Sequence, residues 1–383
     1  MKFNFLGPSN PLLPVNVDVE RTVNFYIENT GPGTPKASPT LLYTPGRHYA
    51  GSVTGEAVRT LMACGVTSTG GRVFGLSTNT FFEITPGAPD MITVTEWGTV
   101  AENTAAGQQS TLCTNGFAGD QVFIVSGGQG YIFTLSTNTF AVIGDTDFPI
   151  GNAGCGVFLD GYFIVLNLDN SSFQLSALED GTTWDPLDVA QRSDTPDSIV
   201  TMVVFRNELW LMGHLATEVW YDSGFALFPF QPVQGALIQI GVTYPRTVCV
   251  LDNALWFTGI ERSQGSLRVW RAVNYTPVEV STQAVTNAIG ATDFNVDQLR
   301  AWTYAEGMHS FYGLRLPTNA SWFYDQATGL WHERGVYNAD TDDFDPDYVE
   351  CHVQTSGLNL CGDSTHGVIW NQSLRFLDDE CLV

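Results

Sequence analysis

The sequence predicts an all-β protein, a β-propeller of seven four-stranded blades. Two observations lead to this prediction: short apolar strands meet in pairs at tight turns, and the pairs recur about every 40–50 residues. The chain has 383 residues, with 38 Gly, 18 Pro and only 15% charged residues. This composition suits many short strands joined by tight turns and disfavours long solvated helices and disorder.

A turn followed by an apolar strand marks the start of each repeat. The second turn residues are 71, 120, 161, 207, 253, 307 and 357, giving steps of 49, 41, 46, 46, 54 and 50 residues. Most turns carry Gly or Asn, which tolerate the positive φ that tight hairpins need. The predicted turns are Gly70–Gly71, Gly119–Asp120, Asp160–Gly161, Arg206–Asn207, Asp252–Asn253, Glu306–Gly307 and Ser356–Gly357.

Each repeat continues with a third strand that has an aromatic residue near its middle, and six repeats have a fourth strand. The third strands are predicted at 80–84, 131–135, 171–175, 217–221, 267–271, 321–325 and 367–371. The fourth strands are predicted at 92–97, 139–143, 183–187, 226–230, 277–281 and 330–334.

The seventh repeat lacks a comparable fourth strand downstream. The segment TLLYTPG, residues 40–46, is predicted to supply it from the other end of the chain. Such closure removes exposed sheet edges and joins the two termini. The chain then divides into an N-terminal arm, residues 1–39, and a propeller, residues 40–383. Six blades with the last unit packed otherwise is the alternative, and a frayed terminus is the alternative to an arm that contacts a neighbouring subunit or an adaptor.

The charge balance bears on the class of partner. The chain has 16 basic and 40 acidic residues, a formal net charge of −24, and no basic run. Duplex DNA carries a phosphate every ~1.7 Å, and binding it requires Lys and Arg to replace counterions. The acidity therefore either aids solubility or lets nucleic acid pass without adhering.

Cysteine usage and the N-terminus bear on the compartment. The seven cysteines form no C-x-x-C and are interpreted as free thiols of a protein folded in a reducing cytosol. Residues 1–14 contain no apolar run long enough for a signal peptide. No stretch approaches the ~18 apolar residues of a membrane helix, so no membrane insertion is expected.

Motifs for catalysis and cofactor binding are missing from the sequence. It contains no G-x-S-x-G, H-E-x-x-H, G-x-G-x-x-G or P-loop, so we expect no enzyme activity, cofactor or metal. A glycosidase needs two carboxylates beside one sugar, and a sialidase-like site needs clustered arginines for a carboxylate. With so few basic residues spread over seven repeats, such a cluster is not expected. Structural roles are assigned to His48, His214, His309, His332, His352 and His366.

Two further features have competing interpretations. The stretch from Asp340 to Asp347 contains five Asp residues that can offer oxygen ligands to calcium, but the EF-hand order is missing, and a solvated loop is favoured. Ten Trp residues can form lectin platforms, but most fall at matched strand positions, where core packing explains them first.

The segment SALEDGTTWDPLD, residues 176–188, approaches the Ser-x-Asp-x-Gly-x-Thr-Trp box of sialidase propellers. Glu179 takes the Asp position and Ala177 the Ser position. The segment joins the third and fourth strands of the third repeat, and Asp180–Gly181 is predicted to form the turn. It carries no catalytic group in this interpretation.

With these features in place, the chain resembles the packaged-DNA stabilisation proteins of short-tailed phages, also called tail accessory, hub or nozzle proteins. The resemblance lies in ERTVNFYIE (20–28), TLLYTPG (40–46), LDGYFIV (159–165) and three longer segments between residues 173 and 241, and it fades after about residue 290. The matching positions are Arg21, Asn24, Tyr26, Glu28, Thr44, Pro45, Gly46, Asp160, Gly161, Asp180, Gly181 and Trp184.

The resemblance implies a structural virion protein. Such proteins form a ring, hexameric by this resemblance, below the portal and its adaptor ring in the virion tail. The ring extends the DNA channel, retains the packaged genome, and anchors a tail needle, spike or fibres. An acidic channel wall would repel DNA within a Debye length of ~8–10 Å, so that DNA slides without sequence-specific binding. The alternatives are a carbohydrate-active propeller, either a sialidase-like hydrolase or a lectin, and a generic scaffold that binds host proteins.

Overall fold

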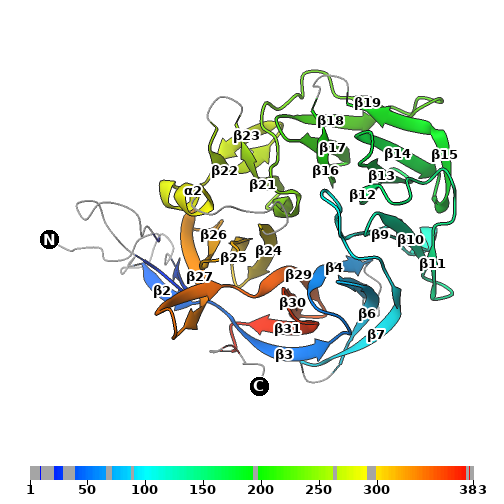
Figure 1. Ribbon diagram of the computed structural model, residues 1–383. Coiled ribbons are helices and arrows are strands. Elements are labelled where there is room, and N and C mark those ends of the chain that lie inside the picture. The colour runs from blue at the N-terminus through cyan, green and yellow to red at the C-terminus, as the bar shows by residue number, and fades with distance from the viewer. Residues whose placement is uncertain are drawn as a thin grey trace.

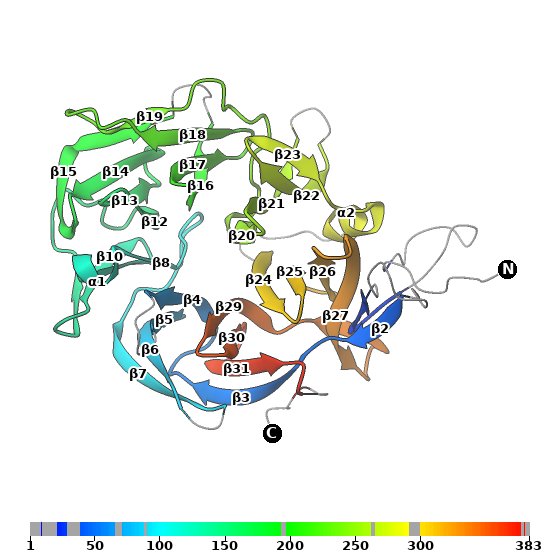
Figure 2. The same cartoon turned by 180° about the vertical axis from the view of Figure 1, so that it is seen from behind.

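Figure 1 shows seven antiparallel sheets arranged around one axis in the computed structural model. The structure describes residues 9, 21–28, 39–65, 71–87, 90–192, 197–261, 265–290, 299–376 and 379. The predicted seven-bladed propeller is confirmed, and the six-bladed alternative does not form. Each blade runs from an inner strand near the axis to an outer strand at the rim, as both views show (Figures 1 and 2).

The first four blades follow one another along the chain. Blade one consists of β4 (Val58–Cys64), β5 (Arg72–Ser77), β6 (Thr80–Pro86) and β7 (Ile92–Thr99). Blade two consists of β8 (Thr111–Thr114), β9 (Gln121–Ser126), β10 (Gln129–Thr134) and β11 (Thr139–Val142). Blade three consists of β12 (Ala153–Leu159), β13 (Tyr162–Asn167), β14 (Ser172–Ala177) and β15 (Asp180–Gln191). Blade four consists of β16 (Ile199–Phe205), β17 (Glu208–Gly213), β18 (Thr217–Asp222) and β19 (Phe230–Pro232).

The last three blades depart slightly from this pattern. Blade five consists of β20 (Cys249–Leu251), β21 (Ala254–Ile260), β22 (Leu267–Val273) and β23 (Thr276–Glu279). Blade six has five strands: β24 (Arg300–Glu306), β25 (His309–Arg315), β26 (Ser321–Asp325), β27 (Leu330–Asn338) and β28 (Asp343–Pro346). Blade seven consists of β29 (Val349–Thr355), β30 (Leu358–Asp363), β31 (Val368–Ser373) and β3 (Gly46–Ser52). The helices are α1 (Gly116–Gly119), α2 (Gln283–Gly290) and the 3₁₀ turn η1 (Pro245–Thr247).

Four of the seven predicted hairpin turns form at the predicted residues. At these turns both central residues have positive φ, for example 47° at Asp160 and 89° at Gly161, which matches the twist of the flanking strands. The sixth turn lies one residue later, at Gly307–Met308. The first two hairpins have longer connections, and α1 fills the second. The confirmed turns are Asp160–Gly161, Arg206–Asn207, Asp252–Asn253 and Ser356–Gly357.

The predicted third strands all overlap observed strands, but the fourth strands match less well. In blade four the predicted strand 226–230 is wrong, because β19 begins only at Phe230. In blade three Asp180 and Gly181 begin β15, and the chain reverses at Leu178–Glu179, so the predicted turn is also wrong. The acidic stretch 340–347 is more than a loop, because residues 343–346 form β28 and pair with β27.

An N-terminal strand closes the ring, but it is not the predicted segment. The closing strand is β3, which pairs with β31 in antiparallel register, for example Arg47 with Gln372. The predicted segment 40–46 mostly forms β2 (Thr40–Tyr43), which pairs with β1 (Phe25–Glu28) in a separate two-stranded sheet. Pro45 has no amide hydrogen to donate and separates β2 from β3.

The core consists of seven hydrophobic clusters, each between two adjacent blades. The cluster between blades one and two, for example, contains Phe74, Phe81 and Phe133, whose rings lie 5.3–5.5 Å apart. Nine of the ten Trp side chains are buried. Core packing, the favoured interpretation of the Trp residues, is therefore confirmed for these nine. The clusters are built from both faces of every sheet, which fixes each blade against its neighbours.

Candidate functional site

The N-terminal signature residues gather on blade six, where they form what we call the N-terminal clasp: residues 21–28 together with 40–46. The backbone of this segment joins the outer part of the blade. Val23 forms a parallel bridge with Glu333 of β27. The Asn24 amide donates to the Glu333 carbonyl at 2.8 Å, and the Glu333 amide donates to the Thr22 carbonyl at 2.9 Å. The clasp therefore ties the start of the chain to a strand about 310 residues away.

Asn24 continues this ladder with its side chain. Its Nδ2 donates to the Gly335 carbonyl at 2.9 Å, and its Oδ1 accepts from the Gly335 amide at 3.1 Å. The side-chain amide thus reproduces the donor and acceptor of a backbone peptide group. Asn24 has a φ of 59°, a conformation that Asn tolerates better than most residues. Both properties account for an Asn at this position.

Arg21 links the clasp to two acidic side chains. Its Nε and Nη2 both lie 3.1 Å from Glu333 Oε2, and its Nη1 lies 2.8 Å from Asp343 Oδ1. Hydrogen bonding to Arg21, followed by the Phe344 amide, lowers the pKa of Asp343. One residue of the acidic stretch therefore serves as a counter-charge for the clasp.

Tyr26 anchors the clasp in the core. Its ring is buried, and it belongs to the hydrophobic cluster between blades six and seven. The ring lies 4.9 Å from that of His309 and 5.4 Å from that of Phe311, both in edge-on geometry. An aromatic ring buried in this way contributes both apolar area and a specific orientation.

Glu28 completes a line of three titratable groups. Its Oε2 lies 2.6 Å from His309 Nε2, and His309 Nδ1 lies 2.8 Å from Asp325 Oδ2. Burial alone would lower the pKa of His309, but hydrogen bonds to Glu28 and Asp325 and their negative charges outweigh it and raise the pKa. The imidazolium form is therefore favoured between the two carboxylates.

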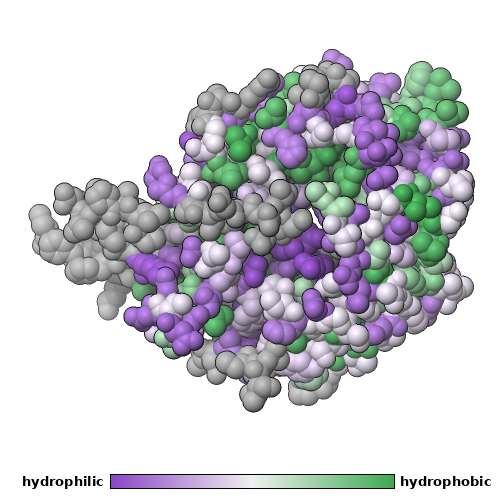
Figure 3. Space-filling model, viewed as in Figure 1, coloured by the Kyte–Doolittle hydropathy of each residue, from purple (hydrophilic) through white to green (hydrophobic). Residues whose placement is uncertain are grey.

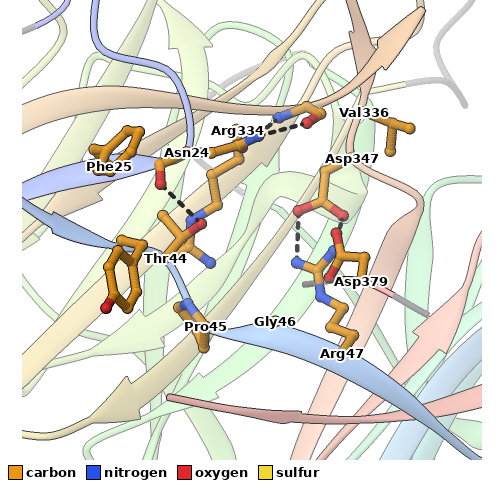
Figure 4. A pocket seen from close by; sticks show the side chains of 12 residues that line it. Asn24, Phe25, Thr44, Pro45, Gly46, Arg47, Arg334, Val336, Asp347 and Asp379 are labelled. Carbon is orange, nitrogen blue, oxygen red and sulfur yellow. Dashed lines mark hydrogen bonds and ion pairs between the residues drawn. The ribbon is translucent and has the colours of Figure 1, made fainter. Parts of the chain in front are cut away.

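The remaining N-terminal signature residues, Thr44, Pro45 and Gly46, line a pocket of about 340 Å³ beside Asn24. Figure 4 shows Asn24, Thr44 and Pro45 on one side of this pocket, and Arg47 and Asp347 directed toward one another on the other. The Thr44 amide donates to the Asn24 carbonyl at 3.1 Å, so the two parts of the clasp hold each other.

Arg47 and Asp347 form a buried bidentate ion pair in that pocket. Arg47 Nη1 and Nη2 each lie 2.7 Å from one oxygen of Asp347, and Arg47 Nε donates to Gln372 at 3.0 Å. This pair fixes β3 against blade six and the start of blade seven. Arg334 lines the same pocket, donates to the Tyr304 hydroxyl and stacks on the ring of Phe323 at 4.2 Å.

Three central signature residues hold blade three against blade two. Asp180 Oδ1 accepts from Gln121 Nε2 at 3.2 Å, and the Gly181 amide donates to Gln121 Oε1 at 2.8 Å. A Cβ on Gly181 would come within 2.6 Å of Ile132 Cδ1 and 2.9 Å of Phe163 Cδ2, so a larger residue here would require these side chains to move. Trp184 is buried, and its Nε1 donates to the Gly181 carbonyl at 2.9 Å. The segment that resembles an Asp box is thus a blade junction.

The turn Asp160–Gly161 connects blades three and four. Asn207 Nδ2 donates to both oxygens of Asp160, at 3.2 and 3.1 Å. The neighbouring turn continues the chain of contacts, since Arg206 donates to the side chain of Asn253 in blade five at 3.1 Å. Every signature residue therefore lies in the clasp or at a blade junction.

A second pocket of about 370 Å³ lies on the propeller axis, lined by the inner strands of six blades. Three arginines converge there on one oxygen, Glu350 Oε1: Arg300 Nε at 3.0 Å, Arg246 Nη1 at 3.4 Å and Arg59 Nη1 at 3.5 Å. From so few basic residues we expected no arginine cluster. This expectation is wrong, because the inner strands converge on the propeller axis and bring three arginines together. The signal in the sequence is a charged residue at the first or second position of three first strands, β4, β24 and β29, whereas Arg246 lies in η1 and has no such signal.

Three aspartates of the acidic stretch, residues 340–347, have separate interaction partners. Asp343 and Asp347 pair with arginines, and Asp345 accepts from Asn338 at 2.8 Å, so these carboxylates face separate partners. Among the described residues, no group of three His, Cys, Asp or Glu side chains is placed to hold a metal ion.

The six described cysteines are free thiols, and burial raises the pKa of Cys155 to about 11. In the same part of the chain, no helix is long and apolar enough to span a membrane.

A comparison with known protein families identifies one that matches most of the chain. A family profile described as "Bacteriophage P22 Gp10, beta-propeller" matches residues 53–371, which includes most of all seven blades. No curated protein matches the chain. The matched range begins after the clasp, so the N-terminal signature lies outside it.

Solved structures share the fold at low sequence identity. The extracellular domain of the putative one component system BT4673 from B. thetaiotaomicron is 9% identical with a TM-score of 0.53 over 86% of this chain. This chain spans only 40% of that domain's length. YCF48 from Cyanidioschyzon merolae is 10% identical with a TM-score of 0.50, over 87% of this chain and all of YCF48. At these identities the likeness concerns the fold alone.

Proposed function

The chain belongs to the phage stabilisation family described as the bacteriophage P22 Gp10 β-propeller, and we propose that this phage structural protein forms the nozzle, or hub, ring of a short tail. In this proposal six copies surround the DNA channel below the portal and its adaptor ring. The ring retains the packaged genome and anchors a tail needle, spike or fibres. Family membership is the observation that carries the proposal.

An apolar patch on the rim of blade six supports a ring. It consists of Phe25, Leu41, Tyr43 and Val336, and all four side chains are exposed. Three of them line the pocket beside the clasp. Large exposed apolar residues that cluster, rather than occurring singly, mark interaction surfaces.

A second apolar patch lies on the rim of blade four, in the segment after β18. It consists of Phe225 and Leu227, which line one pocket and are 57% and 83% exposed. Figure 1 shows β15 and the β18–β19 region on the far side of the disc from β2 and β27. A head-to-tail ring needs two different surfaces on opposite sides of each subunit. The two patches meet this requirement.

The hydrolase alternative lacks its catalytic groups in the described part of the axial pocket. A glycosidase needs two carboxylates near one sugar, and Glu350 is the one acidic side chain among the residues that line this pocket. Its Oε1 is already engaged by three arginines. The lectin alternative is disfavoured because nine of the ten Trp side chains are buried.

The overall charge is compatible with a DNA conduit. With a formal net charge of −24 per chain, a ring of any size carries excess negative charge, and in this proposal part of it faces the channel. At distances within the Debye length, ~8–10 Å, such a wall repels phosphates and reduces adhesion. Retention of the genome in this proposal therefore depends on steric closure rather than on attraction.

Electron microscopy tests the location and the ring. Antibody against this protein is applied to intact virions, and the purified protein is imaged by negative stain with and without the portal and adaptor. We expect label at the tail and a six-fold ring. Label on the capsid, or a single molecule under all of these conditions, contradicts the proposal.

Two rim variants test the head-to-tail contact. Leu227→Asp removes the blade-four side and Val336→Asp the blade-six side, while Leu178→Asp changes an exposed leucine outside both patches and serves as the control. Each rim variant alone should be monomeric, and their mixture should yield dimers through the one intact junction. Dimers of either variant alone would indicate a symmetric contact instead.

A further inference from the structure

The pocket beside the N-terminal clasp, called the clasp pocket below, contains an arginine whose hydrogen-bonding capacity is not used. Arg334 lines this pocket and is only 3% exposed. Its Nη2 donates to the Tyr304 hydroxyl, but its Nε and Nη1 have no hydrogen-bond partner among the described residues. Unpaired donors of a buried charged group cost free energy, and such groups are rare in folded proteins.

The two carboxylates that line the clasp pocket are bound elsewhere. Asp347 accepts from both terminal nitrogens of Arg47, at 2.7 Å each. Asp379 accepts a hydrogen bond from the backbone amide of Arg47. Arg334 instead lies over the ring of Phe323 at 4.2 Å. An acceptor oxygen that enters this pocket would therefore meet two unused donors.

The walls of the clasp pocket include exposed apolar side chains. Phe25, Tyr43 and Val336 line it and are 42%, 52% and 43% exposed. Figure 4 shows Phe25 and Val336 on either side of Arg334. The volume of about 340 Å³ lies in the range of binding pockets, roughly 300–1,000 Å³. Apolar walls together with unused buried donors fit a peptide segment that brings an apolar side chain and an acceptor oxygen.

A loop on the opposite side of the disc offers apolar side chains of this kind. We call residues 222–229, between β18 and β19, the rim loop. The Ser223 amide donates to the Pro229 carbonyl at 2.7 Å and closes the loop at its base. Phe225 and Leu227 project from it and are 57% and 83% exposed. In Figure 3, hydrophobic surface gathers at the upper right of the molecule, where Figure 1 places β15 and β19.

The rim loop also offers a carboxylate. Asp222 Oδ1 accepts from the Gly224 amide at 2.7 Å, which fixes the start of the loop. The loop borders a pocket whose charged lining residues, among those described, are Asp188 and Asp222, both acidic. The charge on this side of the disc is therefore complementary to the unused guanidinium donors of Arg334.

We propose that the rim loop of one copy enters the clasp pocket of the next copy. The two apolar side chains of the loop pack against the apolar walls of the pocket, and Asp222 accepts a hydrogen bond from Nε or Nη1 of Arg334. The closed base holds the loop in shape before binding, which reduces the entropy lost on association. This inference rests on the head-to-tail ring of the proposed function, and it adds which side chains of one copy complete the pocket of the other.

Dimers with one intact junction test this contact. The Leu227→Asp protein keeps its clasp pocket and the Val336→Asp protein keeps its rim loop, so their mixture forms a single loop-in-pocket contact. Asp222→Asn in the Val336→Asp protein should raise the Kd of this dimer about tenfold, as expected for the loss of a charge-assisted hydrogen bond. Sedimentation equilibrium measures the Kd.

The same substitution in the other partner is the matched control. The rim loop of the Leu227→Asp protein is not used in this dimer, so Asp222→Asn placed there should leave the Kd unchanged. Both measurements use the same chemical change in the same loop. They therefore separate the contact from any effect on overall charge or stability.

Arg334→Gln is the reciprocal test. In the Leu227→Asp protein it should raise the Kd about tenfold, and in the Val336→Asp protein it should have no effect, because that clasp pocket is not used. Combined with Asp222→Asn on the opposite side of the junction, it should cause no further loss, because both changes remove one hydrogen bond. The Asp222→Asn measurements remain decisive if Arg334→Gln destabilises the fold.

The outcomes distinguish this contact from the ring itself. A dimer that responds equally whichever partner carries Asp222→Asn overturns the contact and leaves the head-to-tail ring in place. A mixture that stays monomeric also overturns the contact. Six-fold rings of the unchanged protein in negative stain would then show that the ring forms through other surfaces, and their absence would overturn the ring as well.

Discussion

Single residues with unusual conformations or environments hold the N-terminal clasp. Asn24 combines a positive φ with two side-chain hydrogen bonds to Gly335, and few other residues satisfy both demands. His309 lies between the carboxylates of Glu28 and Asp325. The stability of the clasp at these two residues depends on particular hydrogen bonds and charges rather than on buried apolar area. Conservative substitutions can therefore measure what each of these interactions contributes.

Replacement of Asn24 should separate backbone strain from hydrogen bonding. Asn24→Ala loses both side-chain bonds and places a Cβ at φ 59° without compensation, so we expect a loss of about 1–3 kcal/mol in the free energy of unfolding. Asn24→Gly relieves the strain and should lose less. Denaturant unfolding measures both. Equal losses would mean that the backbone conformation contributes nothing.

The stability of the clasp should depend on pH through His309. Its pKa in the folded protein is raised above the value of about 6.5 in the unfolded chain. Its contribution is therefore fully present below pH 6.5 and is lost as the pH rises through the folded-state pKa. Hydrogen exchange of the amides in β1 should accelerate over that interval.

His309→Gln provides the comparison for this pH dependence. Glutamine can still hydrogen-bond, but it does not titrate, so exchange in β1 should lose the additional pH sensitivity. If the dependence is unchanged in this variant, another group causes it, and His309 is not responsible.

At the scale of elements, the N-terminal segment closes the ring in two ways. Strand β3 is the outer strand of blade seven, and Ala50 packs in the cluster between blades seven and one. Tyr26 packs in the cluster between blades six and seven. The strand and the clasp are connected through Pro45, but they make separate contributions.

Two truncations should distinguish these contributions. Removal of residues 1–45 deletes all of the clasp except Gly46, which begins β3, so the propeller should fold with reduced stability. Removal of residues 1–52 also deletes β3 and exposes the edge of β31, which should cause aggregation. Size-exclusion chromatography and circular dichroism report the two outcomes. A soluble, cooperatively folded product of the longer deletion would show that closure by β3 is dispensable.

At the scale of the whole molecule, charge is the dominant feature. With 40 acidic and 16 basic residues, repulsion among carboxylates opposes the compact state. Several of the arginines are used in pairs that join blades or the clasp, such as Arg47 with Asp347. The protein therefore uses scarce positive charge where elements from distant parts of the chain meet.

Salt should therefore stabilise this protein. Raising sodium chloride from about 10 mM to 150 mM shortens the Debye length from ~30 to ~8 Å and screens the repulsion. We expect a higher melting temperature, measured by scanning calorimetry in a buffer free of phosphate. A lower melting temperature would mean that exposed ion pairs such as Arg21–Asp343 outweigh the repulsion.

Local patterns in the sequence determined the number of blades, all of the third strands and four hairpin turns, because turn residues and aromatic strand centres act within a few residues of each other. Sequence reasoning placed the closing strand about six residues too early, and the division of the chain at residue 39 stays a prediction. The signature positions were identified from their resemblance, but nothing near them in the sequence indicated which blade they contact.

Only the tertiary structure decided which distant residues meet. Arg59 and Glu350 are separated by 291 residues, and Arg21 and Glu333 by 312. The periodic pattern in the sequence predicts that each blade has an inner strand. It does not show that the inner strands converge on one axis, and this convergence is what brings three arginines from distant parts of the chain together. The physical reason is that closing the ring is a property of all seven blades at once, and no local segment contains it.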